Sequence, residues 1–187
     1  MFNALTAAFP VTDRCEAGDA SRLSEPVRGV LAKMGGVTLA RGFYRFHTAD
    51  SAVAANAACA ELIRGFAGRY HAFAFDWLGR ELAVDVRAGQ TDGAVIVVDP
   101  GGAEYLESDL PLSAWHDVVA SEEDVLAYRF YMAWRVANPE AGGLGFDQVI
   151  GYKHPLFLGG ADEVENLELS GRDVYFSLCT QIATQLR

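Results

Sequence analysis

The four histidines of this 187-residue chain are its natural candidates for acid–base chemistry, because a histidine changes charge near neutral pH. His71 and Asp76 fall in one predicted strand, and His154 lies in the C-terminal part. If these three side chains converged, a cleft around them would suit a small hydrolase-like enzyme. A histidine in an aromatic strand is more often an ordinary core or edge residue, and we expect His47 and His116 at the surface.

The sequence lacks the local motifs that nucleophilic catalysis, metal binding or phosphate binding would need. The chain has no GxSxG, SxxK or HExxH motif, and none of its glycine pairs belongs to a phosphate-binding loop. Its three cysteines are widely spaced, and Cys59 and Cys179 have the surroundings of small buried hydrophobic residues. We therefore expect no metal, no cofactor and no catalytic residue, and predict that the protein is not an enzyme.

The acidic residues are distributed unevenly along the chain. Residues 88–128 contain nine acids and neither lysine nor arginine, so this stretch gives any fold a negative surface. The nine are Asp92, Asp99, Glu104, Glu107, Asp109, Asp117, Glu122, Glu123 and Asp124. A second, shorter run contains Asp162, Glu163, Glu165 and Glu168. Such a surface either only solubilises the protein or steers a basic partner toward it.

The overall charge excludes two classes of partner. With 25 acidic and 15 basic residues the formal net charge is −10, which repels nucleic-acid backbones and anionic membranes. We expect no direct binding of nucleic acid and no membrane association. The N-terminus has no signal-peptide pattern, which favours a cytoplasmic location.

The elements expected around these residues form an α+β fold, an antiparallel β-sheet meander flanked by helices. Hydrophobic periodicity and capping residues predict helices at 24–34, 51–67, 111–119 and 122–136, and a C-terminal helix with Val174, Leu178, Ile182 and Leu186 on one stripe. Alternating apolar residues between turn signals predict strands at 42–46, 70–77, 81–86, 94–98 and 103–106. We expect a single domain over 1–187, with residues 1–20 as an N-terminal arm.

The segment 146–187 carries an unusual motif, in which a hydrophobic strand runs into Leu-Gly-Gly and then Glu-Asn-Leu. Its defining positions are Gly151, Tyr152, Pro155, Leu158, Gly159, Gly160, Asp162, Glu165, Asn166 and Leu167. Gly159 and Gly160 allow a turn that is closed to residues with side chains, and Asn166 can bond backbone across a loop. These positions are architectural rather than catalytic.

This motif resembles the C-terminal domain of type VI secretion immunity proteins of the Tdi1 type, which are distantly similar to SUKH (SMI1/KNR4-like) immunity proteins. The resemblance implies an SMI1/KNR4-like single domain that binds a cognate secreted toxin, often a nuclease, and blocks its active site or its access to substrate. Because nuclease toxins tend to be basic, the acidic surface agrees with this implication.

The resemblance directs attention to aromatic side chains near the acids, where a partner would find anchors. The candidate anchors are Tyr105, Trp115, Tyr128 and Trp134. The predicted partner-binding residues are Glu104, Tyr105, Glu107, Asp109, Trp115, Glu122, Glu123, Asp124, Asp162 and Glu163. Two alternatives stay open: the small enzyme around His71, Asp76 and His154, and a regulatory scaffold of the SMI1/KNR4 type.

Overall fold

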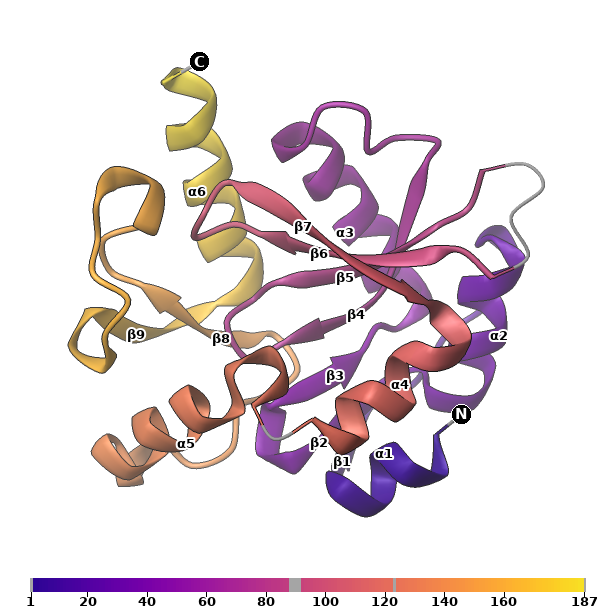
Figure 1. Cartoon of the computed structure of the whole chain (residues 1–187), viewed down its shortest axis with the longest axis horizontal. Helices are drawn as coiled ribbons and strands as arrows, with labels where there is room; N and C mark the ends of the chain where they lie inside the picture. Colours follow the sequence, from indigo (N-terminus) through magenta and orange to yellow (C-terminus); the bar gives the residue numbers. More distant parts are fainter. Residues whose placement is uncertain (1, 88–91, 123, 187) are drawn as a thin grey trace.

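The computed structural model describes residues 2–87, 92–122 and 124–186. Its main feature is an antiparallel sheet of seven strands whose order in space, β1 to β7, is their order along the chain (Figure 1). The strands are β1 (Val11–Arg14), β2 (Val37–Leu39), β3 (Tyr44–Phe46), β4 (Tyr70–Asp76), β5 (Glu81–Asp85), β6 (Ala94–Asp99) and β7 (Glu104–Pro111). The predicted meander and α+β class are therefore confirmed.

Within the described residues six α-helices surround the sheet, and a second small sheet lies beside it (Figure 1). The helices are α1 (Asn3–Ala8), α2 (Glu25–Met34), α3 (Ala49–Leu62), α4 (Leu112–Ser121), α5 (Tyr128–Ala137) and α6 (Arg172–Gln185). The small sheet pairs β8 (Gln148–Tyr152) with β9 (Leu167–Gly171). Helix α1 packs on α4, and α3 packs on α6.

Alternation along the central strands divides the core into two layers, because successive residues of a strand point to opposite faces. One face carries Phe73, Leu82, Val84, Val95 and Val97, which pack with side chains of α1, α2, α4 and α5. The other face carries Ala72, Ala83, Ile96 and Val98, which pack with side chains of α3 and α6. Both faces are thus covered, which explains why β5 is buried along its whole length.

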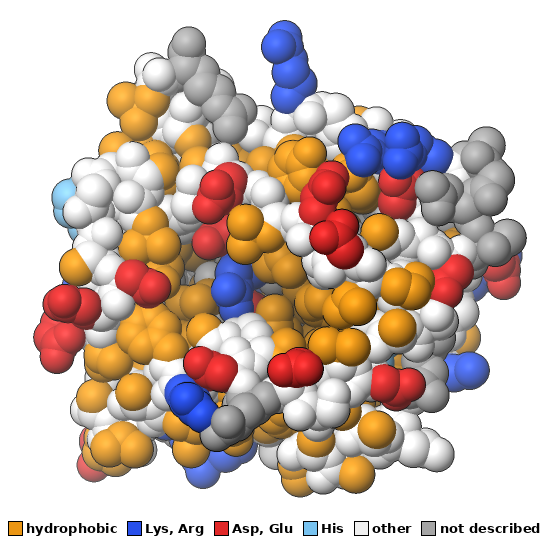
Figure 2. Space-filling view, viewed as in Figure 1, with side chains coloured by type: hydrophobic (Ala, Val, Ile, Leu, Met, Phe, Trp, Pro, Cys, Tyr) orange, Lys and Arg blue, Asp and Glu red, His pale blue; other side chains and the backbone are white. Residues whose placement is uncertain are grey.

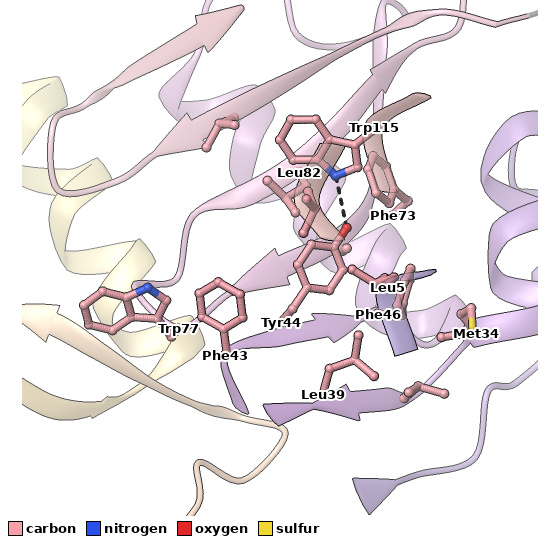
Figure 3. Close-up of a cluster of buried hydrophobic side chains, with 14 of the residues drawn as sticks. Leu5, Met34, Leu39, Phe43, Tyr44, Phe46, Phe73, Trp77, Leu82 and Trp115 are labelled. Carbon is pink, nitrogen blue, oxygen red and sulfur yellow. Dashed lines mark hydrogen bonds between the residues drawn. The ribbon is translucent and has the colours of Figure 1, made fainter. Parts of the chain in front are cut away.

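An aromatic cluster fills the first layer (Figure 3). Tyr44 projects from β3 toward Trp115 of α4, and the Trp115 Nε1–H donates to Tyr44 Oη at 3.2 Å. Phe43, Phe46 and Phe73 lie around this pair (Figure 3). The Phe-Tyr-Arg-Phe run predicted as a strand therefore places large side chains on both sides of β3.

Local sequence explains the limits of two helices. Helix α3 begins after a capping box, in which Thr48 and Ser51 exchange side-chain and backbone hydrogen bonds of 3.1 and 2.9 Å. Helix α2 begins after Ser24 with a proline in its first turn, and it ends at Gly35.

Five expectations about the elements differ from the structure. The arm at 1–20 contains α1 and β1, and β2 lies in a stretch for which we expected no strand. The predicted helix 51–67 ends at Leu62, and β7 is longer than the strand expected at 103–106. The predicted helix 122–136 is wrong at its start, because a 3₁₀ turn at Val125–Ala127 precedes α5.

The C-terminal helix is present, but the stripe that we used to predict it faces solvent in part. Val174 is 59% exposed and Leu178 is 53% exposed. The buried side of α6 carries Tyr175, Phe176 and Cys179. Helix α6 carries apolar side chains on both its buried and its exposed side. The spacing of the exposed ones therefore also matched that expected of a core-facing stripe.

Backbone hydrogen bonds attach the small sheet to the large one. The Ile150 N–H of β8 donates at 2.8 Å to the carbonyl oxygen of Trp77, which directly follows β4. Phe157 N–H reaches Gly101 O in the β6–β7 turn at 3.3 Å. Among the residues that the structure describes, no helix has the length and apolar character that a membrane span requires.

Candidate functional site

Strand β7 carries the first group of predicted partner-binding residues. It is the last strand of the large sheet, and Glu104, Tyr105, Glu107 and Asp109 are all exposed. Tyr105 pairs with Val98 and Glu107 pairs with Ile96, so both side chains point to the α3 side. Glu104 points to the other side, so the acids border both faces of the edge.

Two neighbouring side chains affect this edge: Arg69 offsets part of its negative charge, and Tyr70 lies beside Tyr105. Arg69 lies 3.9 Å from Glu107 and 3.6 Å from Asp85, so part of the negative charge is balanced. The ring of Tyr105 lies 6.3 Å from that of Tyr70 and keeps 37% of its surface exposed. Tyr105 is therefore accessible to a partner.

Trp115 does not offer a surface anchor. It is only 4% exposed, and its indole N–H is bonded to Tyr44. Trp134 is also buried, and Tyr128 is half-buried beside Phe43, with ring centroids 4.8 Å apart. Proximity to acids in the sequence was a poor guide, because these aromatic residues lie on the core side of α4 and α5.

The acids at 122–124 connect α4 to α5. Glu122 is exposed and ends α4, and Asp124 is exposed with its Oδ1 accepting from the Arg129 N–H at 2.7 Å. Glu123 lies outside the described residues. Because α5 begins at Tyr128, Arg129 lies in its first turn, so Asp124 bonds a backbone N–H at the N-terminus of that helix.

Asp162 and Glu163 lie on the exposed loop before the 3₁₀ turn Val164–Asn166. Asp162 Oδ1 accepts a hydrogen bond of 2.6 Å from Tyr152 Oη, so this acid has a structural role as well. Asn166 bonds the backbone of His154 and Ala161, as the motif predicts. Figure 2 shows the acidic side chains of one face scattered among hydrophobic ones, around a hollow that contains a basic side chain.

The three residues of the enzyme alternative have separate surroundings. His71 Nδ1 is 2.9 Å from Ser24 Oγ, whereas Asp76 is buried and bonds Arg80 and the Leu78 backbone. His154 is exposed on the loop that follows β8. No cavity found among the described residues contains more than one of the three.

A buried polar cluster lies where α3, α6 and the large sheet meet, and we did not predict it. His47 Nε2 is 2.7 Å from Glu81 Oε2, and Arg172 Nη1 is 3.4 Å from Glu81 Oε1. The expectation of a surface position for His47 is wrong, because it is fully buried. Burial lowers the pKa of His47, although Glu81 opposes that shift, so the imidazole is neutral and Arg172 balances the carboxylate.

Ser51 completes a chain of contacts in this cluster, with Oγ 2.9 Å from His47 Nδ1. A serine, a histidine and a carboxylate stand here in the order of a hydrolytic triad. However, the serine hydroxyl belongs to the capping box of α3, and none of the cavities found in the described ranges is lined by Ser51 or His47. The chain of contacts therefore serves to fix α3 on the sheet.

Two arginines share one aromatic ring beside the cluster. The Arg45 and Arg172 guanidinium carbons lie 4.5 and 4.6 Å from the centre of the Phe75 ring. Arg45 donates to Gly145 O at 2.8 Å and to Asp76 O at 3.0 Å, so it joins the loop before β8 to the large sheet. Burial lowers the pKa of Arg45. The sequence feature that could have indicated a buried arginine is its position within an aromatic strand.

His116 is the second histidine that we expected at the surface, and that expectation is also wrong. It is fully buried, and its ring stacks on Phe46 with centroids 5.5 Å apart. Its Nε2 is 3.3 Å from Tyr44 Oη, and its buried Nδ1 has no hydrogen-bond partner within the part of the chain that the structure describes. Burial lowers the pKa of His116 to about 3.

The α+β fold holds most of the predicted partner-binding acids at exposed positions on β7, on the α4–α5 connection and on the loop before β9. Residues 121–183 match a family of type VI secretion immunity proteins. That family is described as T6SS immunity protein Tdi1, C-terminal. The resemblance predicted from the motif is confirmed for this segment, which runs from the end of α4 through most of α6.

A solved structure covers nearly the whole fold. The crystal structure of Atu4351 from Agrobacterium tumefaciens superposes with a TM-score of 0.62 at 13% identity, over 97% of this chain and 89% of that one. At this identity the likeness shows the fold alone. No curated protein matches the chain. The similarity to SMI1/KNR4 proteins stays a prediction.

Proposed function

We propose that this protein is an immunity protein that binds a cognate secreted bacterial toxin and neutralises it without catalysis. The match of residues 121–183 to the Tdi1 C-terminal family is the observation that carries the proposal. The toxin is expected to be basic and to act as a nuclease. The protein would then work in the cytoplasm, because a nuclease toxin meets its substrate there.

The distribution of charge supports this function through the rate of association. Exposed carboxylates on β7 and on the α4–α5 connection face solvent, and the formal net charge of the chain is −10. A negative surface raises the encounter rate with a basic toxin and occupies the surface with which that toxin holds nucleic acid. Inhibition by occupation needs no chemical step.

Surface exposure selects among the predicted contacts. Tyr105 combines an accessible ring with flanking carboxylates at Glu104 and Glu107, which is the composition of an interface anchor with a charged rim. We keep Glu104, Tyr105, Glu107, Asp109, Glu122, Glu123, Asp124, Asp162 and Glu163 as the proposed contact residues. Trp115 supports the fold behind them.

The test is a titration of toxin activity. The product of the gene beside this one is purified, its DNA cleavage is measured, and this protein is added in steps. We expect a stable complex, restored growth on co-expression and complete inhibition at an equimolar ratio. Inhibition at a small fraction of an equivalent would indicate catalysis, and continued toxicity without a complex would overturn the proposed function.

A further inference from the structure

A cleft lies between α3 and α6, on the side of the large sheet that is opposite to α4. Its volume is about 340 Å³. Four alanines of α3, Ala54, Ala55, Ala57 and Ala58, form one wall, and Phe176 of α6 belongs to the other. Because alanine side chains are short, the two helices leave a groove where larger residues would fill the space.

The floor of the cleft is polar. Arg172 and Glu81 lie there, and they are bonded to each other and to neighbouring groups. Thr180 is only 5% exposed and lines the same cleft, yet its Oγ1 has no hydrogen-bond partner among the described residues. A buried hydroxyl without a partner is unfavourable, so a ligand group that bonds it would remove that cost.

The lining carries an excess of negative charge. Three carboxylates, Glu61, Glu81 and Asp173, face one guanidinium, that of Arg172, which leaves a formal charge of −2. Glu61 and Asp173 are exposed at the rim, and Glu81 is buried at the floor. This arrangement attracts a cation from solvent and holds it over apolar walls.

We propose that the α3–α6 cleft receives an arginine or lysine side chain of the protein partner. The aliphatic stem lies against Ala57 and the Phe176 ring, the charged head faces Glu61 and Glu81, and the Thr180 hydroxyl accepts one of its hydrogen bonds. This inference rests on the proposed function, because a basic toxin supplies such side chains. It adds to the acidic edge a concave anchor site, where binding energy concentrates.

The position of the cleft favours a protein as the occupant. Its α6 wall belongs to the segment that matches the immunity family, whereas its α3 wall belongs to the part of the chain outside that match. The acidic rim is exposed, so a side chain that projects from a second protein can approach the cleft from solvent.

The first experiment uses N-acetyl-arginine amide as a probe and its citrulline analogue as the uncharged control. Methyl signals of Ala57, Ala58 and Thr180 are followed by NMR during titration. We expect saturable shifts with the arginine probe, a Kd of the order of 1 mM for a single side chain, and at least about tenfold weaker binding of the citrulline probe. Equal shifts with both probes, or none with either, would overturn the inference.

Two substitutions should weaken this binding by different means. Ala57→Leu fills the groove, and Glu61→Gln removes a rim charge without changing its size. Val53→Leu and Asp50→Asn are the matched controls, because both residues are exposed on α3 and neither lines the cleft. We expect about a tenfold loss of probe affinity for each cleft variant and none for the controls.

The same four variants then enter the toxin titration described above. If wild-type protein inhibits the toxin and Ala57→Leu inhibits it equally well, the cleft is not the anchor and the proposed function stands. If wild-type protein does not bind the toxin, the proposed function fails, and the probe titration still decides whether the cleft binds a basic side chain.

Discussion

Glu81 Oε1 lies 3.4 Å from Arg172 Nη1, and this buried contact joins the segment that matches the immunity family to the sheet formed by the first half of the chain. His47 bonds the other oxygen of Glu81, and Arg172 also bonds Asp173. The side chains of Glu81 and Arg172 are 3% and 5% exposed. Because both side chains are buried, the charge of each one is balanced by the charge of the other.

Removing one member of this pair should destabilise the protein strongly. Arg172→Met leaves the Glu81 carboxylate buried without its counter-charge, which should lower the free energy of unfolding by about 3–5 kcal/mol. The double variant Glu81→Gln with Arg172→Met removes both charges and should recover about half of that loss. Urea unfolding of the four proteins at pH 7.5 measures the coupling, and simple addition of the two single effects would contradict it.

His116 should make the protein sensitive to acid. Its pKa falls from 6.5 to about 3 on burial, so the unfolded chain takes up the proton first as the pH drops below 6.5. The stability contributed by the neutral ring is complete above that pH and is lost toward pH 3. Between pH 7.5 and 5 the loss from this group is about 2 kcal/mol.

The control is His116→Phe, which keeps a flat ring against Phe46. Its free energy of unfolding should fall less than that of the wild-type protein over the same pH interval. His47 and His71 also have lowered pKa values through burial, so some acid sensitivity should remain in the variant. A variant with the wild-type pH profile would show that the pKa of His116 is the same in the folded and unfolded states.

Trp115 and Tyr105 should respond to substitution in opposite ways. Trp115→Ala removes a buried ring and should cost about 3–5 kcal/mol of stability. Tyr105→Ala removes an exposed ring and should cost less than about 1 kcal/mol, while it weakens the toxin complex by more than about 1 kcal/mol. Thermal unfolding and calorimetric titration with the toxin separate the two effects, and a milder change, Trp115→Phe, should leave toxin affinity unchanged.

Gly160 should tolerate no side chain. A Cβ built there would overlap the His154 carbonyl oxygen, so Gly160→Ala must displace the turn and should cost about 1–3 kcal/mol. Gly29 in α2 is the matched control, because a Cβ there meets no atom within 4 Å. Gly29→Ala should raise stability by about 0.5–1 kcal/mol, as measured by urea unfolding. Equal effects of the two changes would contradict the packing of the motif.

Charge reversal should identify the acids that guide the toxin. Glu122→Lys with Asp124→Lys should slow association about tenfold at low salt and reduce the salt dependence of the rate. Glu16→Lys with Glu140→Lys changes the net charge equally at other exposed positions and should slow it less. Stopped-flow mixing with the toxin measures both, and equal rates for the two double variants would remove the α4–α5 connection from the interface.

The meander was predictable because its turns and its alternation are both local signals. Leu78-Gly79-Arg80 and Pro100-Gly101-Gly102 end strands whose neighbours pair in sequence order. Strands β1 and β2 have four and three residues, which is too few for a period to be visible. β2 forms because β3 offers it a partner, and β1 in turn pairs with β2.

The buried cluster could not be predicted in the same way. Arg172 meets Glu81 across 91 residues of sequence and His47 across 125. Spacing rules apply only to residues that are close together in the sequence. Each of these residues, taken alone, is a polar type that usually lies at the surface. The acids of β7 were found from composition, but their division between the two sides of the strand required the register with β6.

Strand β7 ends the large sheet, so its outer edge could pair with a strand of another molecule. Asp109 has a φ of +56°, and the pairing with β6 shifts register nearby. Together with the exposed carboxylates of Glu104 and Glu107, this irregularity opposes strand addition by a second copy. Under the proposed function, neutralising these acids would therefore lower the solubility of the protein as well as its affinity for the toxin.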